Sequence, residues 1–178
     1  MSHERVAEAT AKATGERETN RQVAAGMYCE YLAELQQIQG KLPGQGTFME
    51  RFVSVWEADD TVWHFLYDGK RIAGFVVIGL YPNCHPAADY YIEDAYVIPA
   101  ARGKGLMKDF ILRHTREHGT VYCMFVLTKN AKAAGYWDYV FSLAGYGPLA
   151  LSEVAKPDPL LMQKGYRAKE RKRKGWVL

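Results

Sequence analysis

The stretch YIEDAYVIPAARGKGLMKDF, residues 91–110, joins a strand pattern to a helix pattern through a short basic turn. Its first half is apolar and β-branched apart from Glu93 and Asp94, which predicts a strand. Glycines and positive charge follow in the turn Arg102–Gly105. A helix start offers unpaired N–H groups and partial positive charge, and glycine lets a ligand approach the backbone. The turn therefore predicts a phosphate or pyrophosphate site, with a tight turn of solvated basic residues as the alternative.

The rest of the chain alternates between helix and strand signals. Apolar residues recur at helical spacing over residues 21–39, with Asn20 able to cap the start and Gly40 to end the helix. Thr47 and Glu50 form a capping-box pattern for a second helix. The order of the remaining predicted elements requires at least one parallel strand pair with a crossover helix. These remaining elements are a hairpin around Asp68-Gly69, a strand at 89–98, a helix at 105–118, a strand at 121–128, a helix at 131–144, and weaker strands at 149–154 and 160–166.

Length and composition favour one cytoplasmic domain. A chain of 178 residues is typical of a single domain with its own core. Its three cysteines lack metal-like spacing and suggest reduced thiols. The charged N-terminus does not resemble a signal peptide, and no apolar run approaches the roughly 20 residues of a membrane span. We predict a polar N-terminal extension over 1–20, a domain over 21–166 and a basic tail over 167–178.

The charge of the chain is unevenly distributed. Seven basic residues and one acidic residue lie between Lys164 and Leu178, while the rest of the chain is mildly acidic. Such a tail fits an electrostatic contact with nucleic acid or another acidic partner. A solvated terminus is the favoured alternative.

The opening stretch resembles the acetyl-CoA signature of the GNAT superfamily of acetyl-CoA-dependent N-acyltransferases. The resemblance spans about Thr61–Tyr166, and its EDxYV strand is most similar to polyamine and small-amine acetyltransferases. It implies a single α/β domain with a mostly antiparallel central sheet, a splayed parallel strand pair and about four flanking helices. The family's first strand is not evident before residue 21. The residues that carry the signature are Val97-Ile98-Pro99 and Arg102-Gly103-Lys104-Gly105-Leu106-Met107.

The same resemblance implies an acetyl-CoA site. The Val97 N–H would hold the oxyanion of the thioester carbonyl, and Asn130 would bond pantetheine, cap a helix, or do both. Met107 stands where the family prefers glycine or alanine, so its side chain is expected to crowd the pyrophosphate. The remaining cofactor-binding residues implied are Arg102, Gly103, Lys104, Gly105 and Leu106.

Catalytic residues are less clearly marked. Glu93 matches the glutamate proposed as base in polyamine-acetylating relatives, and it is our candidate ahead of Asp94. Alternation along a strand places Asp94 on the opposite face, and a structural role for both carboxylates is the alternative. The family's acid tyrosine corresponds in position to Trp137, so Tyr136 is the candidate acid, with Tyr139 or neither as alternatives.

We therefore expect transfer of an acetyl group from acetyl-CoA to a primary amine of a small amine, polyamine, amino acid or protein. A CoA- or nucleotide-binding module without turnover, and a nucleic-acid- or ribosome-associated acyltransferase, are the rivals. A homodimer is compatible with the sequence, and a membrane partner is not expected. His114 and His118 share helical spacing but lack a third ligand, so we predict no metal site and a solvated helix face.

Overall fold

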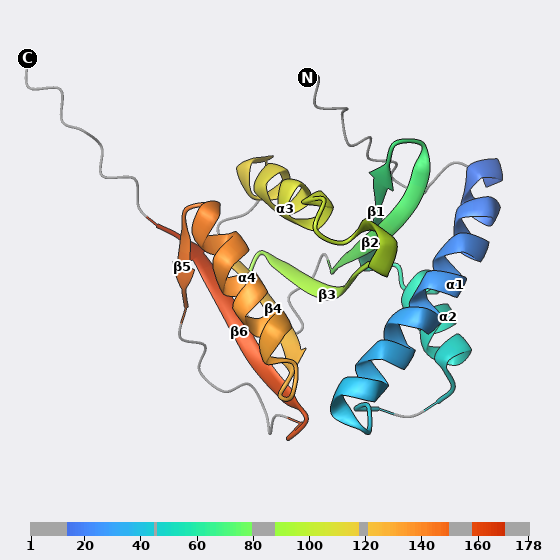
Figure 1. Ribbon diagram of the computed structural model, residues 1–178, viewed down its shortest axis with the longest axis horizontal. Helices are drawn as coiled ribbons and strands as arrows, with labels where there is room; N and C mark the ends of the chain where they lie inside the picture. The colour runs from blue at the N-terminus through green and yellow to red at the C-terminus, as the bar shows by residue number, and fades with distance from the viewer. Residues whose placement is uncertain (1–13, 45, 80–87, 118–120, 150–157, 170–178) are drawn as a thin grey trace, which may run out of the picture.

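Two helices precede three consecutive strands, and two further helices are interspersed among the remaining strands of one sheet (Figure 1). The computed structural model describes residues 14–44, 46–79, 88–117, 121–149 and 158–169. The elements are α1 (Thr14–Gln39), α2 (Phe48–Glu57), β1 (Thr61–Asp68), β2 (Arg71–Gly79), β3 (Tyr90–Val97), a 3-10 turn η1 (Pro99–Ala101), α3 (Leu106–Glu117), β4 (Val121–Leu127), α4 (Ala131–Leu143), β5 (Tyr146–Pro148) and β6 (Leu161–Ala168).

The strands form a six-stranded sheet in the order β1-β2-β3-β4-β6-β5. Strands β3 and β4 run parallel, and every other neighbouring pair in the described chain is antiparallel. Helix α3 is the crossover between β3 and β4, as a parallel pair requires. The mixed sheet with four flanking α-helices confirms the predicted α/β fold class.

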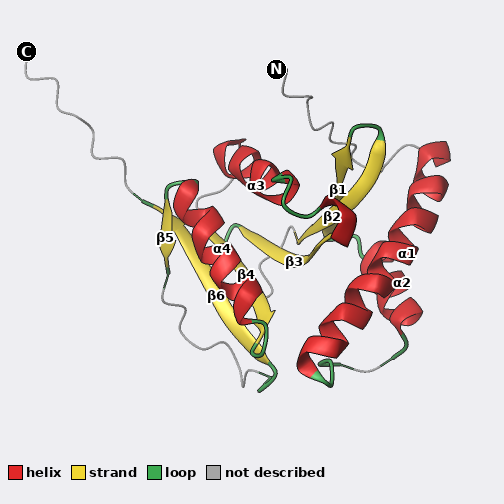
Figure 2. Ribbon diagram, viewed as in Figure 1, coloured by secondary structure: helices red, strands yellow, loops and turns green. Residues whose placement is uncertain are grey.

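Alternation along β2 divides the core into two layers. Phe75 and Val77 pack with α1 and α2, whereas Val76 and Ile78 pack in the cluster that contains α3 and α4. Figure 2 shows the same division, with α1 and α2 on the right and α3 and α4 on the left. Most of β2 is buried between these layers because both of its faces are covered.

Two local predictions are confirmed in detail. The Thr47 hydroxyl accepts a hydrogen bond from the Glu50 N–H at 3.2 Å, and the Glu50 carboxylate accepts one from the Thr47 N–H at 2.6 Å. This capping box opens α2. The Asp68-Gly69 turn joins β1 to β2 in an antiparallel hairpin, with Gly69 at a φ of 61°.

The boundaries of the first helix and the last strand differ from the prediction. Helix α1 begins at Thr14, so Asn20 lies inside it and does not cap it. The polar, alanine-rich sequence before Arg21 favours helix without showing an apolar face, which explains why periodicity missed it. Any strand before α1 would lie in residues 1–13, which are outside the described residues. At the other end β6 continues to Ala168, past the predicted start of the tail, and residues 170–178 lie outside the described residues.

Predictions about a late strand, the cysteines and His114 also need correction. The predicted strand at 149–154 lies mostly outside the described residues, and β5 occupies Tyr146–Pro148 instead. Cys29 carries a free thiol, but Cys123 is disulfide-bonded, so the prediction of reduced thiols is wrong for Cys123. His114 is buried, with Nδ1 2.8 Å from the Tyr122 hydroxyl, because its helix face packs on the sheet. The predicted solvated face is therefore wrong at His114, and His118 lies outside the described residues.

Candidate active site

Strands β3 and β4 are paired at one end and apart at the other. Their parallel register covers only Tyr90–Ile92 against Tyr122–Met124. Beyond these residues a cavity of about 460 Å³ lies between the strands, lined by β3, β4, α1, α2 and α4. The implied splay of the parallel pair is thus present, and it opens next to Glu93.

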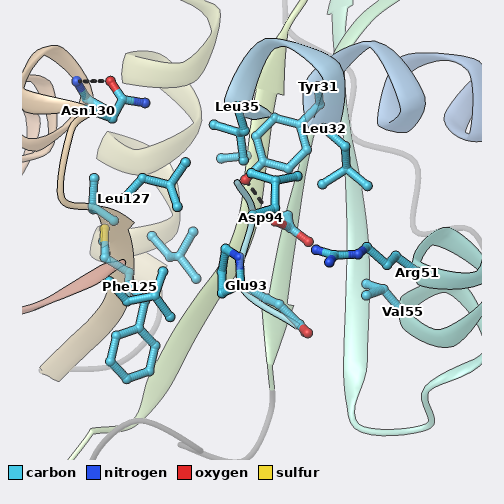
Figure 3. A pocket seen from close by; sticks show the side chains of 18 of the residues that line it. Tyr31, Leu32, Leu35, Arg51, Val55, Glu93, Asp94, Phe125, Leu127 and Asn130 are labelled. Carbon is cyan, nitrogen blue, oxygen red and sulfur yellow. Dashed lines mark hydrogen bonds between the residues drawn. The ribbon is translucent and has the colours of Figure 1, made fainter. Parts of the chain in front are cut away.

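A β-bulge places both acidic residues of β3 at this cavity. Ile92 lies opposite Ile78 of β2, while Asp94 lies opposite the next residue, Val77. Glu93 is therefore the extra residue of a bulge, which breaks the alternation of side chains. Glu93 and Asp94 both line the cavity (Figure 3), so the prediction that Asp94 points to the opposite face is wrong.

Asp94 is held by two tyrosines of α1. The hydroxyls of Tyr28 and Tyr31 each donate a hydrogen bond of 2.8 Å to the Asp94 carboxylate. The two tyrosines are three residues apart and so share one helix face. Burial raises the pKa of Asp94 despite these hydrogen bonds and the nearby charge of Arg51, which lower it. Burial, followed by the Asp94 charge, raises the pKa of both tyrosines, so their hydroxyls stay protonated.

Glu93 has the electrostatics of a base that works near neutral pH. Burial, then the charge of Asp94 and then that of Asp60, raises the pKa of Glu93 to about 7. A carboxyl in this range is partly ionised at neutral pH and accepts a proton from an ammonium group more readily than an ordinary glutamate. Its position in the cavity and its pKa both fit the predicted role.

The backbone of β3 offers groups to the cavity side. Ile98 N–H donates to Ala73 O of β2 at 2.9 Å. Because backbone groups alternate along an antiparallel pair, the neighbouring Val97 N–H points away from β2, toward the side where β4 has diverged. This is the orientation that the predicted oxyanion donor needs.

The turn after β3 has the backbone shape of an anion cradle. Gly103 and Gly105 have φ values of 81° and 83°, which side chains other than glycine rarely adopt. A Cβ atom placed on Gly103 would meet nothing within 4 Å, so the outer side of the turn is open. Helix α3 begins at Leu106, and its first N–H groups lack partners within the helix. These features fit a pyrophosphate.

The basic side chains of the turn are engaged elsewhere. Both terminal nitrogens of Arg102 donate to Glu34 of α1, at 3.0 and 2.5 Å, and its Nε donates to Val97 O at 2.9 Å. Lys104 forms an ion pair with Asp68 of the β1–β2 hairpin. The two side chains tie the turn to neighbouring elements, which leaves the backbone N–H groups as the primary anion donors.

Met107 does not crowd the turn. Its side chain is 7% exposed and packs in the core cluster with Phe110 and Ile111. The prediction of a steric clash with the pyrophosphate is therefore wrong, because the side chain is directed into the core. The sequence position suggested a clash only because the direction of the side chain was unknown.

Helix α4 contributes Asn130 and Trp137 to the cavity. The Asn130 Oδ1 caps the helix by accepting from the Ala133 N–H at 3.1 Å, and the residue also lines the cavity. Trp137 is buried and lines the same cavity, whereas Tyr136 lies on the adjacent face of α4 and is 37% exposed. Burial, followed by the charge of Asp109, raises the pKa of Tyr136 to about 12. Tyr136 is therefore beside the cavity lining.

Sequence reasoning missed Arg51 altogether. It lies on α2 between the buried or half-buried apolar residues of that helix and lines the cavity (Figure 3). No motif marks it, since a lone arginine on an amphipathic helix is normally solvated.

The described ranges contain neither a metal-binding cluster nor a membrane-spanning helix. No group of three or more histidine, cysteine, aspartate or glutamate residues there is arranged to hold a metal ion. None of the helices described is long and apolar enough to cross a membrane.

The sequence matches a known family over most of the region just described. The profile of the Acetyltransferase (GNAT) family matches residues 29–139, which include the C-terminal part of α1, the signature strand, the turn and most of α4. No curated protein matches the sequence significantly.

Solved structures share the fold at low sequence identity. An acetyltransferase from Thermus thermophilus has a TM-score of 0.59 and 15% identity, over 90% of this chain and 94% of that one. A spermidine N-acetyltransferase from Vibrio cholerae, solved with CoA and spermine, has a TM-score of 0.54 and 13% identity, over 90% and 93%. Tetrahymena GCN5 has a TM-score of 0.55 and 11% identity, over 90% and 94%. At these sequence identities, the three comparisons show a shared fold.

Proposed function

The chain belongs to the GNAT family of acetyltransferases and is an N-acyltransferase of that type, and from this premise we propose that it moves an acetyl group from acetyl-CoA to a primary amine bound beside Glu93. One observation carries the proposal: the bulge in β3 places a carboxyl with a pKa of about 7 at the cavity where β3 and β4 separate.

The reaction needs an amine without its proton. We propose that Glu93 accepts this proton, directly or through one water molecule. The amine nitrogen then attacks the thioester carbonyl carbon, the new C–N bond forms, and the C–S bond breaks. A thiolate leaves readily because a thiol has a pKa of about 8.5. Tyr136 stays the proposed proton donor to sulfur, although Trp137 occupies the lining position of α4.

Backbone groups carry the other roles in this proposal. The Val97 N–H would stabilise the oxyanion, since it points to the side on which β4 has diverged. The phosphates of acetyl-CoA would lie at the turn, on N–H groups of Gly103–Met107, while Asn130 would contact pantetheine through the amide nitrogen that capping leaves available. Arg102 and Lys104 would support the turn through Glu34 and Asp68.

The rival functions stay open to test. A CoA-binding module without turnover is favoured by two departures from the family pattern, Met107 in the turn and Trp137 in place of the acid tyrosine. The core packing of Met107 removes the first argument. A nucleic-acid-associated acyltransferase depends on the basic tail, most of which lies outside the described residues. A homodimer and a cytoplasmic location stay predictions from the sequence alone.

The proposal is tested by CoA binding followed by an acceptor screen. CoA should raise the melting temperature of the protein, as a ligand selective for the folded state does. Acetyl-CoA and a panel of primary amines should then release free thiol in proportion to acetylated amine. Absence of a thermal shift at millimolar CoA contradicts the cofactor assignment. CoA binding without acetylation of any amine favours the binding module, and a salt-dependent complex with RNA favours the nucleic-acid-associated enzyme.

A further inference from the structure

Arg51 brings a guanidinium group into the cavity from the side opposite to the splayed strands. Its side chain is half-buried and extends from α2 toward Asp94 (Figure 3). Its Nε atom is inaccessible to solvent and has no hydrogen-bond partner. Across the described part of the chain, no side-chain hydrogen bond or ion pair involves Arg51.

The nearby carboxylates are already bonded to other groups. Asp94 accepts hydrogen bonds from Tyr28 and Tyr31, and Glu50 is engaged in the capping box with Thr47. A buried polar donor without a partner is costly, and a half-buried cation more so. The Nε of Arg51 is such a donor, and no described side chain bonds the rest of the guanidinium. The terminal nitrogens of Arg51 are not among the inaccessible atoms, and they could bind an anion in the cavity, because arginine matches a carboxylate with two parallel hydrogen bonds.

The cavity has an acidic group and a basic group that come from different elements. The Arg51 charge acts on Asp94 and Tyr28, whereas Glu93 is influenced by burial, Asp94 and Asp60. Glu93 reaches the cavity from β3 and Arg51 reaches it from α2 (Figure 3), so the two groups line it from different elements. A ligand that fits both groups has an ammonium group for Glu93 and an anionic group for Arg51.

We propose that the acceptor is a small primary amine that also bears a carboxylate, as an amino acid does, with the amine at Glu93 and the carboxylate at Arg51. This inference rests on the proposed function, whose substrate class it narrows. The cavity of about 460 Å³ falls in the range of small-molecule sites. A polyamine has no group for Arg51 and would place like charge against it.

The test uses matched acceptors that differ only in the anion. Amino acids with apolar, acidic and basic side chains are compared with their primary amides, which keep the amine and lose the carboxylate. Wild type should acetylate the carboxylate member of at least one pair with a kcat/KM about 10- to 100-fold higher, the size expected for a charge-assisted contact. Arg51→Gln should abolish this preference mainly through KM, and Arg51→Lys should restore part of it because charge is kept but the fork is lost.

A control and a second readout make each outcome decisive. Arg71→Gln removes an exposed arginine at the start of β2, outside the cavity lining, and should keep the preference. Calorimetry of the same ligand pairs on the CoA-bound protein measures anion recognition without turnover. Acetylation with no carboxylate preference, or a preference that survives Arg51→Gln, overturns this inference and leaves the proposed function intact. Arg51-dependent binding of the carboxylate ligands without any acetylation supports the anion site and overturns the proposed function instead, and neither binding nor acetylation overturns both.

Discussion

Replacing Glu93 with glutamine removes the proposed base while keeping the size of the side chain. Burial and the Asp94 charge raise the pKa of Glu93 from 4.5 to about 7. With a pKa near 7, about one-tenth of the enzyme has Glu93 ionised at pH 6, so wild-type kcat/KM should rise about tenfold from pH 6 to its plateau. Glu93→Gln should lower the plateau by about 10² to 10⁴, the usual share of general-base catalysis.

The same pKa predicts an opposite effect on stability. Between pH 4.5 and 7 the folded protein retains a proton on Glu93 that the unfolded chain has released. Stability contributed by this group is therefore lost as pH rises through that window. Glu93→Gln cannot ionise, so it should melt higher than wild type at pH 8, and the difference should shrink at pH 5. A loss of rate together with a gain in stability is the combination that a structural carboxylate would not give.

Asp94→Asn separates the two carboxylates in the same assay. Removing its charge lowers the pKa of Glu93, so the acidic limb of the kcat/KM profile should move to lower pH. The measurements are pH–rate profiles and melting curves of wild type and both variants, with CoA binding as the control for folding. Full activity of Glu93→Gln at neutral pH, or an acidic limb that Asp94→Asn leaves in place, would refute the assignment of Glu93 as base.

Three further substitutions test other parts of the structure. Gly74→Ala should lower the free energy of unfolding, measured with denaturant, by about 1–3 kcal/mol, because its Cβ would lie 2.3 Å from a backbone oxygen of β3. The matched Gly26→Ala has no atom within 4 Å of its Cβ and should stabilise α1 by up to about 1 kcal/mol. Equal effects of the two substitutions would contradict the close approach of the strands. Met107→Ala should lower stability by about 2–5 kcal/mol through a core cavity yet leave the CoA affinity of the folded protein unchanged; a large loss of affinity without loss of stability would show a side-chain contact with CoA. Tyr136→Phe should reduce kcat by less than about tenfold, since a thiolate leaves readily even without its proposed proton donor, and a loss of about 10² or more would contradict this weak dependence on protonation.

Much of the fold follows from local sequence signals. The capping box at Thr47, the Asp68-Gly69 turn and the periodicity of the apolar residues each act within a few neighbours, and each predicted its element. The glycine-rich turn likewise required the left-handed conformations observed at Gly103 and Gly105. The start of α1 was missed because its first turns depend on helix propensity without an apolar face.

The candidate site was harder to predict because its geometry is not local. A strand pattern fixes the facing of a side chain only while alternation continues, and the bulge at Glu93 ends it. Nothing in the sequence of β3 marks the bulge, which depends on the register with β2. The pairing of Asp94 with two tyrosines of α1 joins positions more than sixty residues apart, and Arg51 reaches the cavity only once α2 has packed.

Two distortions of the sheet let one strand carry both the proposed oxyanion donor and the proposed base. Glycine at position 74 lets β2 approach β3 so closely that a Cβ would contact Tyr96 O, which fixes the end of β3 that carries Val97. A few residues before Val97, the bulge at Glu93 shifts the register of β3 against β2 by one residue. The Glu93 carboxyl then lies at the cavity. A regular strand would direct the N–H groups of alternate residues toward β4 but would send one of the two carboxylates into the opposite layer. With the bulge, the proposed base Glu93 and the carboxylate of Asp94 both line the same cavity, and the hydroxyls of α1 hold Asp94 in place, while the proposed oxyanion donor, the Val97 N–H, points to the side on which β4 has diverged.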